Sequence, residues 1–403
     1  MNKKFLILWI GEFISSIGSG LTSFGLGVYV FKETGSAGAM ALITLLAFIP
    51  MLVLGIPAGV LADRYDRRIL MMIGDGFSVF GLIYILICVR NGGAKLWQIC
   101  LGVTISAIFS SLLDPAYKAT VTDLVDQKDY TKASGMVNIA SSSRYILAPF
   151  IAGLIFSVWD IQVILIFDIC TFFVTVTAIW FVKKGIKTNV NEKPKNMLDQ
   201  TKEGFMILRK KKGVLILAIY ASLINLFMGF IQVLSEPLVL SFASSKTLGF
   251  CETICAMGML VSSVVLGIKS LKKNYVKITA FSLFFAGIAM IFFGLFDNIS
   301  LITISGFVFF MTLPFANGAL DYLVRSNIDD ELQGRVWGVI GVISLIGSAI
   351  SYAISGVIAD CIGNVFHIGV GRGAGYSILV AGIIMAVIAL FLLRFKSVRE
   401  LER

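Results

Sequence analysis

The chain has 403 residues, of which 57% are hydrophobic and only 14% are charged. A soluble domain of this length does not enclose so much apolar surface, so the composition excludes a soluble globular protein and indicates a chain folded in a lipid bilayer. The net charge of +10 does not indicate nucleic-acid binding, because the segment 183–212 alone carries ten basic and three acidic side chains. Basic residues beside membrane helices attract anionic lipid, so we expect membrane lipids as partners and no nucleic acid.

Twelve apolar segments follow one another along the chain, and each is long enough to cross about 30 Å of hydrocarbon at about 1.5 Å per residue. Their limits are 5–31, 39–61, 69–89, 96–117, 131–157, 160–182, 213–239, 247–268, 276–296, 299–325, 334–360 and 373–394. The runs are continuously apolar and lack the alternation of a membrane β-barrel. The sequence therefore predicts an all-α membrane protein with twelve transmembrane helices.

The distribution of Lys and Arg predicts the orientation of these helices. With the N-terminus in the cytoplasm, and with basic residues at span ends counted with the adjoining segment, the cytoplasmic side holds 28 of the 34 basic residues, the outer loops hold five, and one, Arg144, lies deep inside a span. We therefore expect a multi-pass protein of the plasma membrane with both termini in the cytoplasm.

The segment 183–212 is the one long polar stretch, and it separates six predicted spans from six. The two halves match at a constant offset of 203 residues, which places Asp126 on Asp329 and Gly153 on Gly356. Parallel repeats of this kind are typical of paired helical bundles in transporters. We predict two pseudo-symmetric six-helix bundles, 1–182 and 213–403, joined by a cytoplasmic linker, 183–212.

A dense cluster of charge lies in the short connection between the second and third spans. A loop this short leaves two helices antiparallel and adjacent, with its charges at the membrane surface. The residues singled out here are Gly59, Asp63, Arg64, Arg67 and Arg68.

A charge inside a membrane span is costly and therefore faces the protein interior or marks a pathway, and four charged residues within predicted spans are singled out on this ground. Arg144 lies near mid-depth of the fifth span, and Glu12, Asp75 and Asp168 lie in the first, third and sixth spans. The carboxyl groups are candidates for carrying a proton, and the alternative is a structural ion pair between helices. A buried guanidinium stays protonated, so we expect Arg144 to have a carboxylate partner: Glu12 or Asp75 first, and Asp114 less so.

No nucleophile with its base, no nucleotide-binding loop and no metal-ligand cluster is apparent in the sequence, so we expect neither an enzyme nor a bound metal or cofactor. Glu236, near an outer helix end, is expected to be solvated. Polar and aromatic residues within the spans are candidates for lining a central cavity. These are Phe109, Tyr145, Asn225, Phe227, Gln232 and Asn317.

The sequence resembles the major facilitator superfamily over essentially its whole length. Gly59, Leu61, Ala62, Asp63, Arg64, Arg67 and Arg68 match the family pattern G-x-L-A-D-R-x-G-R-R, with Asp66 in place of the usual Gly. In the fifth predicted helix, Ala148, Pro149, Ala152 and Gly153 are similar to the antiporter motif G-P-x-x-G-G, with Ala twice replacing Gly. The stretches from Asp114 to Asn138 and from Asp160 to Asp168 resemble the drug-exporter branch that includes bacterial macrolide efflux proteins.

The resemblance implies a secondary transporter, an antiporter that exports small amphipathic or hydrophobic compounds in exchange for protons by alternating access, as a functional monomer in a bacterial membrane. Such proteins confer multidrug resistance and use the proton gradient instead of a bound cofactor. The resemblance assigns Asp63 to a latch that holds the two halves together on the cytoplasmic side. The alternative is a transporter of a specific solute, lipid or peptide, or a facilitator.

One departure from the family pattern concerns a buried positive charge. Drug exporters usually carry an Arg in the fourth helix, but the aligned stretch 104–109 has no basic residue. Arg144 instead occupies a family Gly position in the fifth helix. We infer that the positive charge has moved to the neighbouring helix, which puts the usual proton-coupling mechanism in question but not the fold.

Overall fold

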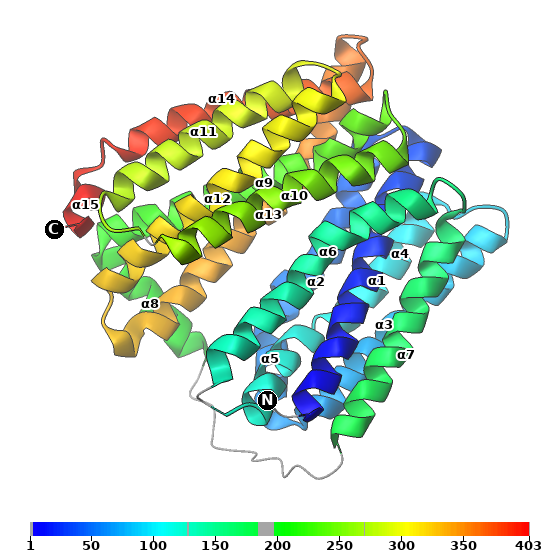
Figure 1. Cartoon of the computed structure of the whole chain (residues 1–403), viewed down its shortest axis with the longest axis horizontal. Coiled ribbons are helices and arrows are strands. Elements are labelled where there is room, and N and C mark those ends of the chain that lie inside the picture. The colour runs from blue at the N-terminus through cyan, green and yellow to red at the C-terminus, as the bar shows by residue number, and fades with distance from the viewer. Residues whose placement is uncertain (1–2, 127–128, 184–196, 270, 403) are drawn as a thin grey trace. The chain divides into compact units, whose positions relative to one another are not determined.

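The computed structural model describes residues 3–126, 129–183, 197–269 and 271–402, and within these ranges the chain is helical apart from short connections (Figure 1). The helices are α1 (Lys3–Thr34), α2 (Ala37–Arg64), α3 (Arg67–Arg90), α4 (Leu96–Ser110), α5 (Leu113–Leu124), α6 (Tyr130–Ile155), α7 (Ile161–Lys183), α8 (Met197–Lys210), α9 (Lys212–Leu240), α10 (Ser245–Ile268), α11 (Tyr275–Leu295), α12 (Ile299–Asn327), α13 (Asp330–Val365), α14 (Val370–Leu392), α15 (Lys396–Arg399) and the 3₁₀ turn η2 (Glu400–Glu402).

Eleven segments of the described chain are long and apolar enough to cross a membrane, where the sequence predicted twelve. The predicted fifth span, 131–157, forms the 26-residue helix α6 but is not among the eleven. Asn138, three consecutive serines and Arg144 lower its hydropathy. The all-helical prediction is confirmed, while the count of twelve membrane spans is not established by length and composition.

The predicted fourth span consists of two helices, α4 and α5, separated by a turn at Ser111 and Leu112. Pro115 explains the interruption, because a proline has no N–H to donate to the carbonyl four residues earlier, and its ring crowds that carbonyl. The amide of Ser111 still donates to Ala107, so α4 ends in a regular hydrogen bond before the chain turns. Asp114 lies in the first turn of α5 and pairs with Lys118 at 2.8 Å.

The chain divides into two compact units. The first unit contains residues Met1–Thr34, Leu42–Pro194 and Ser245–Phe250, and the second contains Gly35–Ala41, Lys195–Ser244 and Cys251–Arg403. Within the first unit, α1 packs against α6 and α7, and α3 packs against α4, α5 and α7. Within the second, α11 packs against α12 and α14, and α13 packs against α8, α9 and α14.

Part of the predicted linker is a packed helix. Residues 184–196 lie outside the described chain, but Met197–Lys210 forms the amphipathic helix α8. Glu203 on α8 pairs with Arg335 on α13 at 2.8 Å, and Gly204 lets the backbone of α8 approach the Arg335 carbonyl closely. The described part of the predicted linker, which begins at Met197, therefore packs within the second unit and is not an extended connection.

The first turn of α2 is capped by a carboxylate from α13, within the second unit. Asp360 accepts hydrogen bonds from the Ala37 amide at 2.8 Å, from the Gly38 amide at 2.9 Å and from the Ser36 hydroxyl at 2.5 Å. The Ser36 oxygen in turn accepts from the Ala39 amide at 3.0 Å. The first amides of a helix lack intrahelical partners, so these contacts satisfy three of them and place a negative charge at the positive helix end.

We expect Asp360→Ala to lower the free energy of unfolding by about 1–2 kcal/mol, because two amides of the first turn lose their acceptors. The measurement is denaturation of the purified protein in detergent. Glu400→Ala is a matched control, since Glu400 is exposed and makes only a 3.9 Å contact with Lys396. Equal stability of the two variants would contradict a capping role for Asp360.

Candidate functional site

Three carboxyl groups from different helices lie close together inside the first unit. Glu12 comes from α1, Asp75 from α3 and Asp168 from α7, and the charges of Glu12 and Asp168 both act on Asp75. Asp75 has an exposed fraction of 0% and Asp168 of 1%. Residues that are distant in sequence thus form one acidic group, with Asp75 and Asp168 buried and Glu12 half-buried, which we call the carboxyl cluster (Glu12, Asp75 and Asp168).

Close helix packing positions Asp168. A Cβ atom added at Gly18 of α1 would lie 2.6 Å from Asp168 Oδ1 and 2.4 Å from Thr171 Oγ1, so only glycine lets α1 approach α7 at this point. The Thr171 hydroxyl donates to the Asp168 carbonyl at 2.7 Å and lies 3.3 Å from its Oδ1. The buried carboxyl group of Asp168 therefore has a polar neighbour on its own helix.

Asp75 lies in a different environment. Neither of its carboxyl oxygens has a hydrogen-bond partner among the described residues, although both are buried. Glu12 also has one buried oxygen without a partner, while its other oxygen faces the Ser16 hydroxyl at 3.4 Å. The hydroxyl of Tyr117, on α5, is buried and unpartnered as well, and the charge of Glu12 acts on it. A buried carboxylate without a partner is very costly, so this arrangement favours a neutral, protonated Asp75.

Arg144 is exposed within α6 instead of being enclosed by the carboxyl cluster. The stem of its side chain packs beside Gly20 of α1, and its positive charge acts on Glu12 and Asp168. In the described part of the chain it forms no ion pair, and Asp114 pairs with Lys118 instead. The expected direct partner of Arg144 is therefore not seen in this conformation, and Asp168, not Asp75, joins Glu12 as a carboxyl group that feels its charge.

The six residues proposed to line a cavity do not share one environment. Phe109 stacks on Phe77 with ring centroids 5.4 Å apart, and Phe227 is buried with 4% exposure. The Asn225 amide donates to Ala221 on its own helix at 2.9 Å, and Gln232 accepts from Tyr352 at 2.9 Å. The other two, Tyr145 and Asn317, are exposed.

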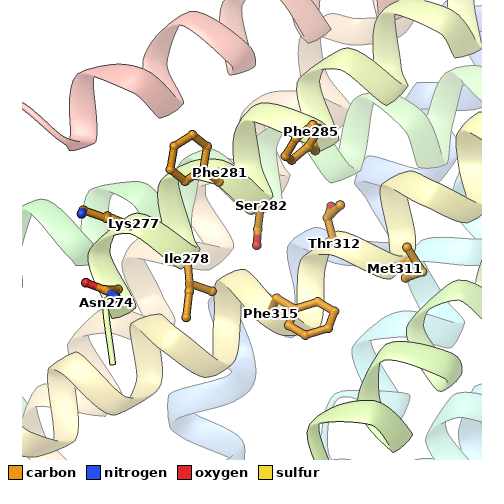
Figure 2. Close-up of a pocket in the computed structure, with 9 residues that line it drawn as sticks. All are labelled: Asn274, Lys277, Ile278, Phe281, Ser282, Phe285, Met311, Thr312 and Phe315. Carbon is orange, nitrogen blue, oxygen red and sulfur yellow. The ribbon is translucent and has the colours of Figure 1, made fainter. Parts of the chain in front are cut away.

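A cavity of about 460 Å³ lies elsewhere, between α11 and α12, and none of these six residues lines it (Figure 2).

A second acidic pair, formed by the half-buried residues Glu236 and Glu252, lies in the second unit. The Ser235 hydroxyl of α9 donates to Glu252 of α10 at 3.1 Å, and the charge of Glu252 acts on Glu236. One Glu236 oxygen is buried without a partner among the described residues, so the expectation that Glu236 is solvated was wrong. Sequence reasoning did not single out Glu252. Its position seven residues into an apolar span could have marked it as a candidate functional residue.

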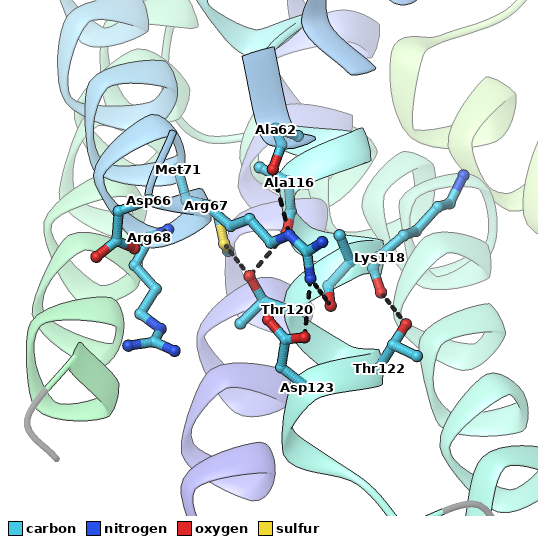
Figure 3. Close-up of polar contacts among 11 residues, drawn as sticks. Ala62, Asp66, Arg67, Arg68, Met71, Ala116, Lys118, Thr120, Thr122 and Asp123 are labelled. Atoms are coloured by element: carbon cyan, nitrogen blue, oxygen red, sulfur yellow. Dashed lines mark hydrogen bonds and ion pairs between the residues drawn. The ribbon is translucent and has the colours of Figure 1, made fainter. Parts of the chain in front are cut away.

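The charged connection between α2 and α3 is held by Arg67 and Asp66 (Figure 3). Arg67 donates to the carbonyl of Ala62 at 3.2 Å and to that of Ala119 at 3.2 Å, and it pairs with Asp123 at 2.8 Å. Asp66 accepts from the Arg68 amide at 3.0 Å and so caps α3, which explains an acidic residue where the resembling pattern has Gly.

The other residues of this connection differ in exposure. Arg68 is buried with 2% exposure, and Arg64 is exposed. Asp63 lies in the last turn of α2, and its side chain is outside the described part of the structure. Among the basic residues of the pattern, Arg67 therefore makes structural contacts here, while the role of Asp63 stays a prediction.

The motif in α6 lies where two helix segments of the first unit come into close contact. Ala148 and Ala152 are fully buried. A Cβ atom at Gly249, in the first turns of α10, would lie 2.2 Å from the Pro149 carbonyl, and one at Gly153 would lie 2.9 Å from the Ser245 carbonyl. Small residues thus let the backbone of α6 touch the first turns of α10, Ser245–Phe250, as in other membrane helix pairs.

A model of the Major Facilitator Superfamily matches residues 8–352. Macrolide efflux protein A of Streptococcus pyogenes is 27% identical over 413 aligned residues, which cover 99% of this chain and 97% of that protein. The Staphyloferrin A transporter of Staphylococcus aureus is 24% identical and covers 91% and 96% of the two chains. A solved bacterial homolog of the human lysosomal transporter Spinster, inward-facing and unoccupied, has a TM-score of 0.77 at 14% identity over 99% of this chain and 98% of that one. Because the family model spans most of the sequence, the chain belongs to the Major Facilitator Superfamily and is a membrane transporter, not an enzyme.

Proposed function

We propose that this transporter exports amphipathic compounds, macrolides among them, in exchange for protons, by alternating access. The names of the macrolide efflux relatives support the substrate class, since the similarity extends over almost the full length of both chains. The proposal includes a functional monomer in the plasma membrane with cytoplasmic termini, and a proton gradient as the energy source with no bound cofactor.

The observation that carries proton coupling is the burial of Asp75 with both carboxyl oxygens unpartnered. A carboxylate in this position is compensated only by a proton or another positive charge. The charges of Glu12 and Asp168 both act on Asp75, and the charge of Arg144 acts on Glu12 and Asp168. Loss of a proton from one of these carboxyl groups therefore changes the electrostatic energy of the others. Ionisable residues inside membrane spans commonly form such proton relays.

In the proposed cycle, the neutral carboxyl cluster is compatible with the packing of α1, α3 and α7 seen here. Release of a proton leaves a negative charge that the exposed Arg144 on α6 attracts, and α6 can then shift against α1 along the contact at Gly20. Substrate binding drives the same exchange by displacing the guanidinium from the carboxyl cluster. Two discrete arrangements of packed helices, each favoured by one protonation state, are what coupling requires.

The direct test is a susceptibility panel in an efflux-deficient bacterial host that expresses the protein, with and without a protonophore. We expect resistance to macrolides and other amphipathic compounds, and we expect the protonophore to remove it. Reconstituted vesicles with an internal pH dye then report proton movement on substrate addition. Substrate transport that is indifferent to the proton gradient would refute the proposal.

A second candidate is the transport of a specific solute, and the similarity to the Staphyloferrin A transporter favours it. The discriminating result is the breadth of the panel. Protection against chemically unrelated amphipathic compounds supports the export of drugs, whereas transport restricted to one polar compound supports the specific transporter.

We expect Asp63→Asn to slow transport while leaving expression and substrate affinity largely intact. Asp63 lies at a helix end beside the membrane surface, so it should affect switching between conformations more than substrate contact. Asp66→Asn is the control, because asparagine also caps helices and should preserve the start of α3. An increased substrate Kd with unchanged turnover would contradict the latch.

A further inference from the structure

The cavity of about 460 Å³ between α11 and α12 is an open groove on the surface of these helices (Figure 2). This volume lies within the range of about 300–1,000 Å³ that is typical of small-molecule sites. Phe281 and Phe285 from α11 and Phe315 from α12 line it. Phe281 is 48% exposed and Phe285 is 54% exposed, so two large apolar side chains form an open wall on membrane-spanning helices.

The charged part of the groove lies at the start of α11, where Lys277 and Asn274 line it, while Ser282 and Thr312 add only uncharged hydroxyl groups further along (Figure 2). The connection just before them adds two further exposed lysines, Lys272 and Lys273. No ion pair involves these three lysines within the described residues. The nearby carboxylate of Glu402 is directed at the Val276 amide, from which it accepts a hydrogen bond at 2.6 Å.

The groove is therefore amphipathic along its length. Lys277 and Phe285 are eight residues apart on one helix, which corresponds to about 12 Å along the axis. The basic end belongs to one of the Lys-rich segments expected to lie in the cytoplasm, at the level of the inner headgroups. The apolar wall extends from there into the hydrocarbon region. One molecule with a negative head and a hydrocarbon tail fits both parts at once.

We propose that this groove binds an anionic phospholipid of the inner leaflet. Its phosphate lies at Lys277 and the lysines that precede α11, and an acyl chain lies against Phe281, Phe285 and Phe315. Basic pockets between membrane helices bind anionic headgroups in this way. The three lysines disfavour a cationic compound at this end, which argues against the groove as a drug-binding site. The inference concerns the second unit alone and does not depend on proton coupling.

The test is native mass spectrometry of the purified full-length protein titrated with phosphatidylglycerol and, separately, with phosphatidylcholine of the same acyl chains. We expect tighter retention of phosphatidylglycerol, and we expect Lys277→Gln to reduce this preference by about fivefold, the effect of one basic residue at an anionic surface. Lys396→Gln is the control. It removes the same charge from an exposed helix position outside the groove, and it should leave the preference unchanged.

A second variant tests the apolar wall. Phe285→Ala should weaken retention of both lipids, because the acyl chain loses an aromatic contact whichever headgroup it carries. Glycerol phosphate, which has the headgroup chemistry without a chain, should not displace the bound lipid. Three results would overturn the proposal: equal retention of the two lipids by the wild type, an unchanged preference in Lys277→Gln, or displacement of the lipid by a macrolide at a concentration that saturates transport.

Discussion

Replacement of Arg144 by alanine is expected to abolish proton-coupled export, while Arg144→Lys is expected to retain part of it. The guanidinium is the positive charge that acts on both Glu12 and Asp168. Without it, a carboxylate formed in the cluster has no cation to attract, so proton release no longer changes the packing of α6. Lysine keeps a charge, but as a single compact ammonium without the planar fork of arginine.

The measurement is substrate-dependent proton flux in reconstituted vesicles, normalised to folded protein. The normalisation separates this prediction from a purely structural role, in which loss of Arg144 mainly lowers the amount of folded protein. Arg394→Ala is a matched control, since Arg394 is also an exposed arginine, with its guanidinium over the ring of Phe391. The coupling role is wrong if Arg144→Ala is stable and still moves protons at the wild-type rate.

Replacement of Asp75 by asparagine is expected to reduce substrate-driven proton flux to the level of protein-free vesicles while preserving the fold. Asparagine has nearly the shape of a protonated aspartate but cannot release a proton. Neither carboxyl oxygen of Asp75 accepts a hydrogen bond from the described residues, so the substitution removes no observed contact. We therefore expect the melting temperature to be equal to or above that of the wild type.

The same vesicles should show that Asp75→Asn still binds substrate, because the residue lies within a packed unit with 0% exposure. Glu400→Gln is the control for the change from carboxylate to amide, at an exposed position. A variant that unfolds would indicate that the charged form of Asp75 is a structural necessity. A variant that exchanges substrate and protons normally would remove Asp75 from the coupling mechanism.

The sequence by itself determined that this chain is an all-helical membrane protein, but not the number of its membrane spans. Continuous apolar runs and an asymmetric distribution of Lys and Arg are one-dimensional signals, so they could be read without coordinates. The same holds for the charged positions Glu12, Asp75, Arg144 and Asp168, because each interrupts an apolar run. The loop pattern around Asp63 gave the family, which the match over residues 8–352 confirms.

Only the tertiary structure decided which groups the charged residues within the spans contact. Which carboxyl groups lie within electrostatic reach of Arg144 depends on how α1, α3, α6 and α7 are rotated about their axes, and helix rotation is set by packing between helices. The side chain of Arg144 therefore lies exposed beside Gly20. Asp75, which was expected as its partner, is buried with no hydrogen-bond partner for its carboxyl oxygens among the described residues. The cap on α2 depends in the same way on Asp360, which is more than three hundred residues away in sequence. The groove beside Phe281 likewise exists only because α11 and α12 leave an open space between them, which no local pattern along the chain encodes.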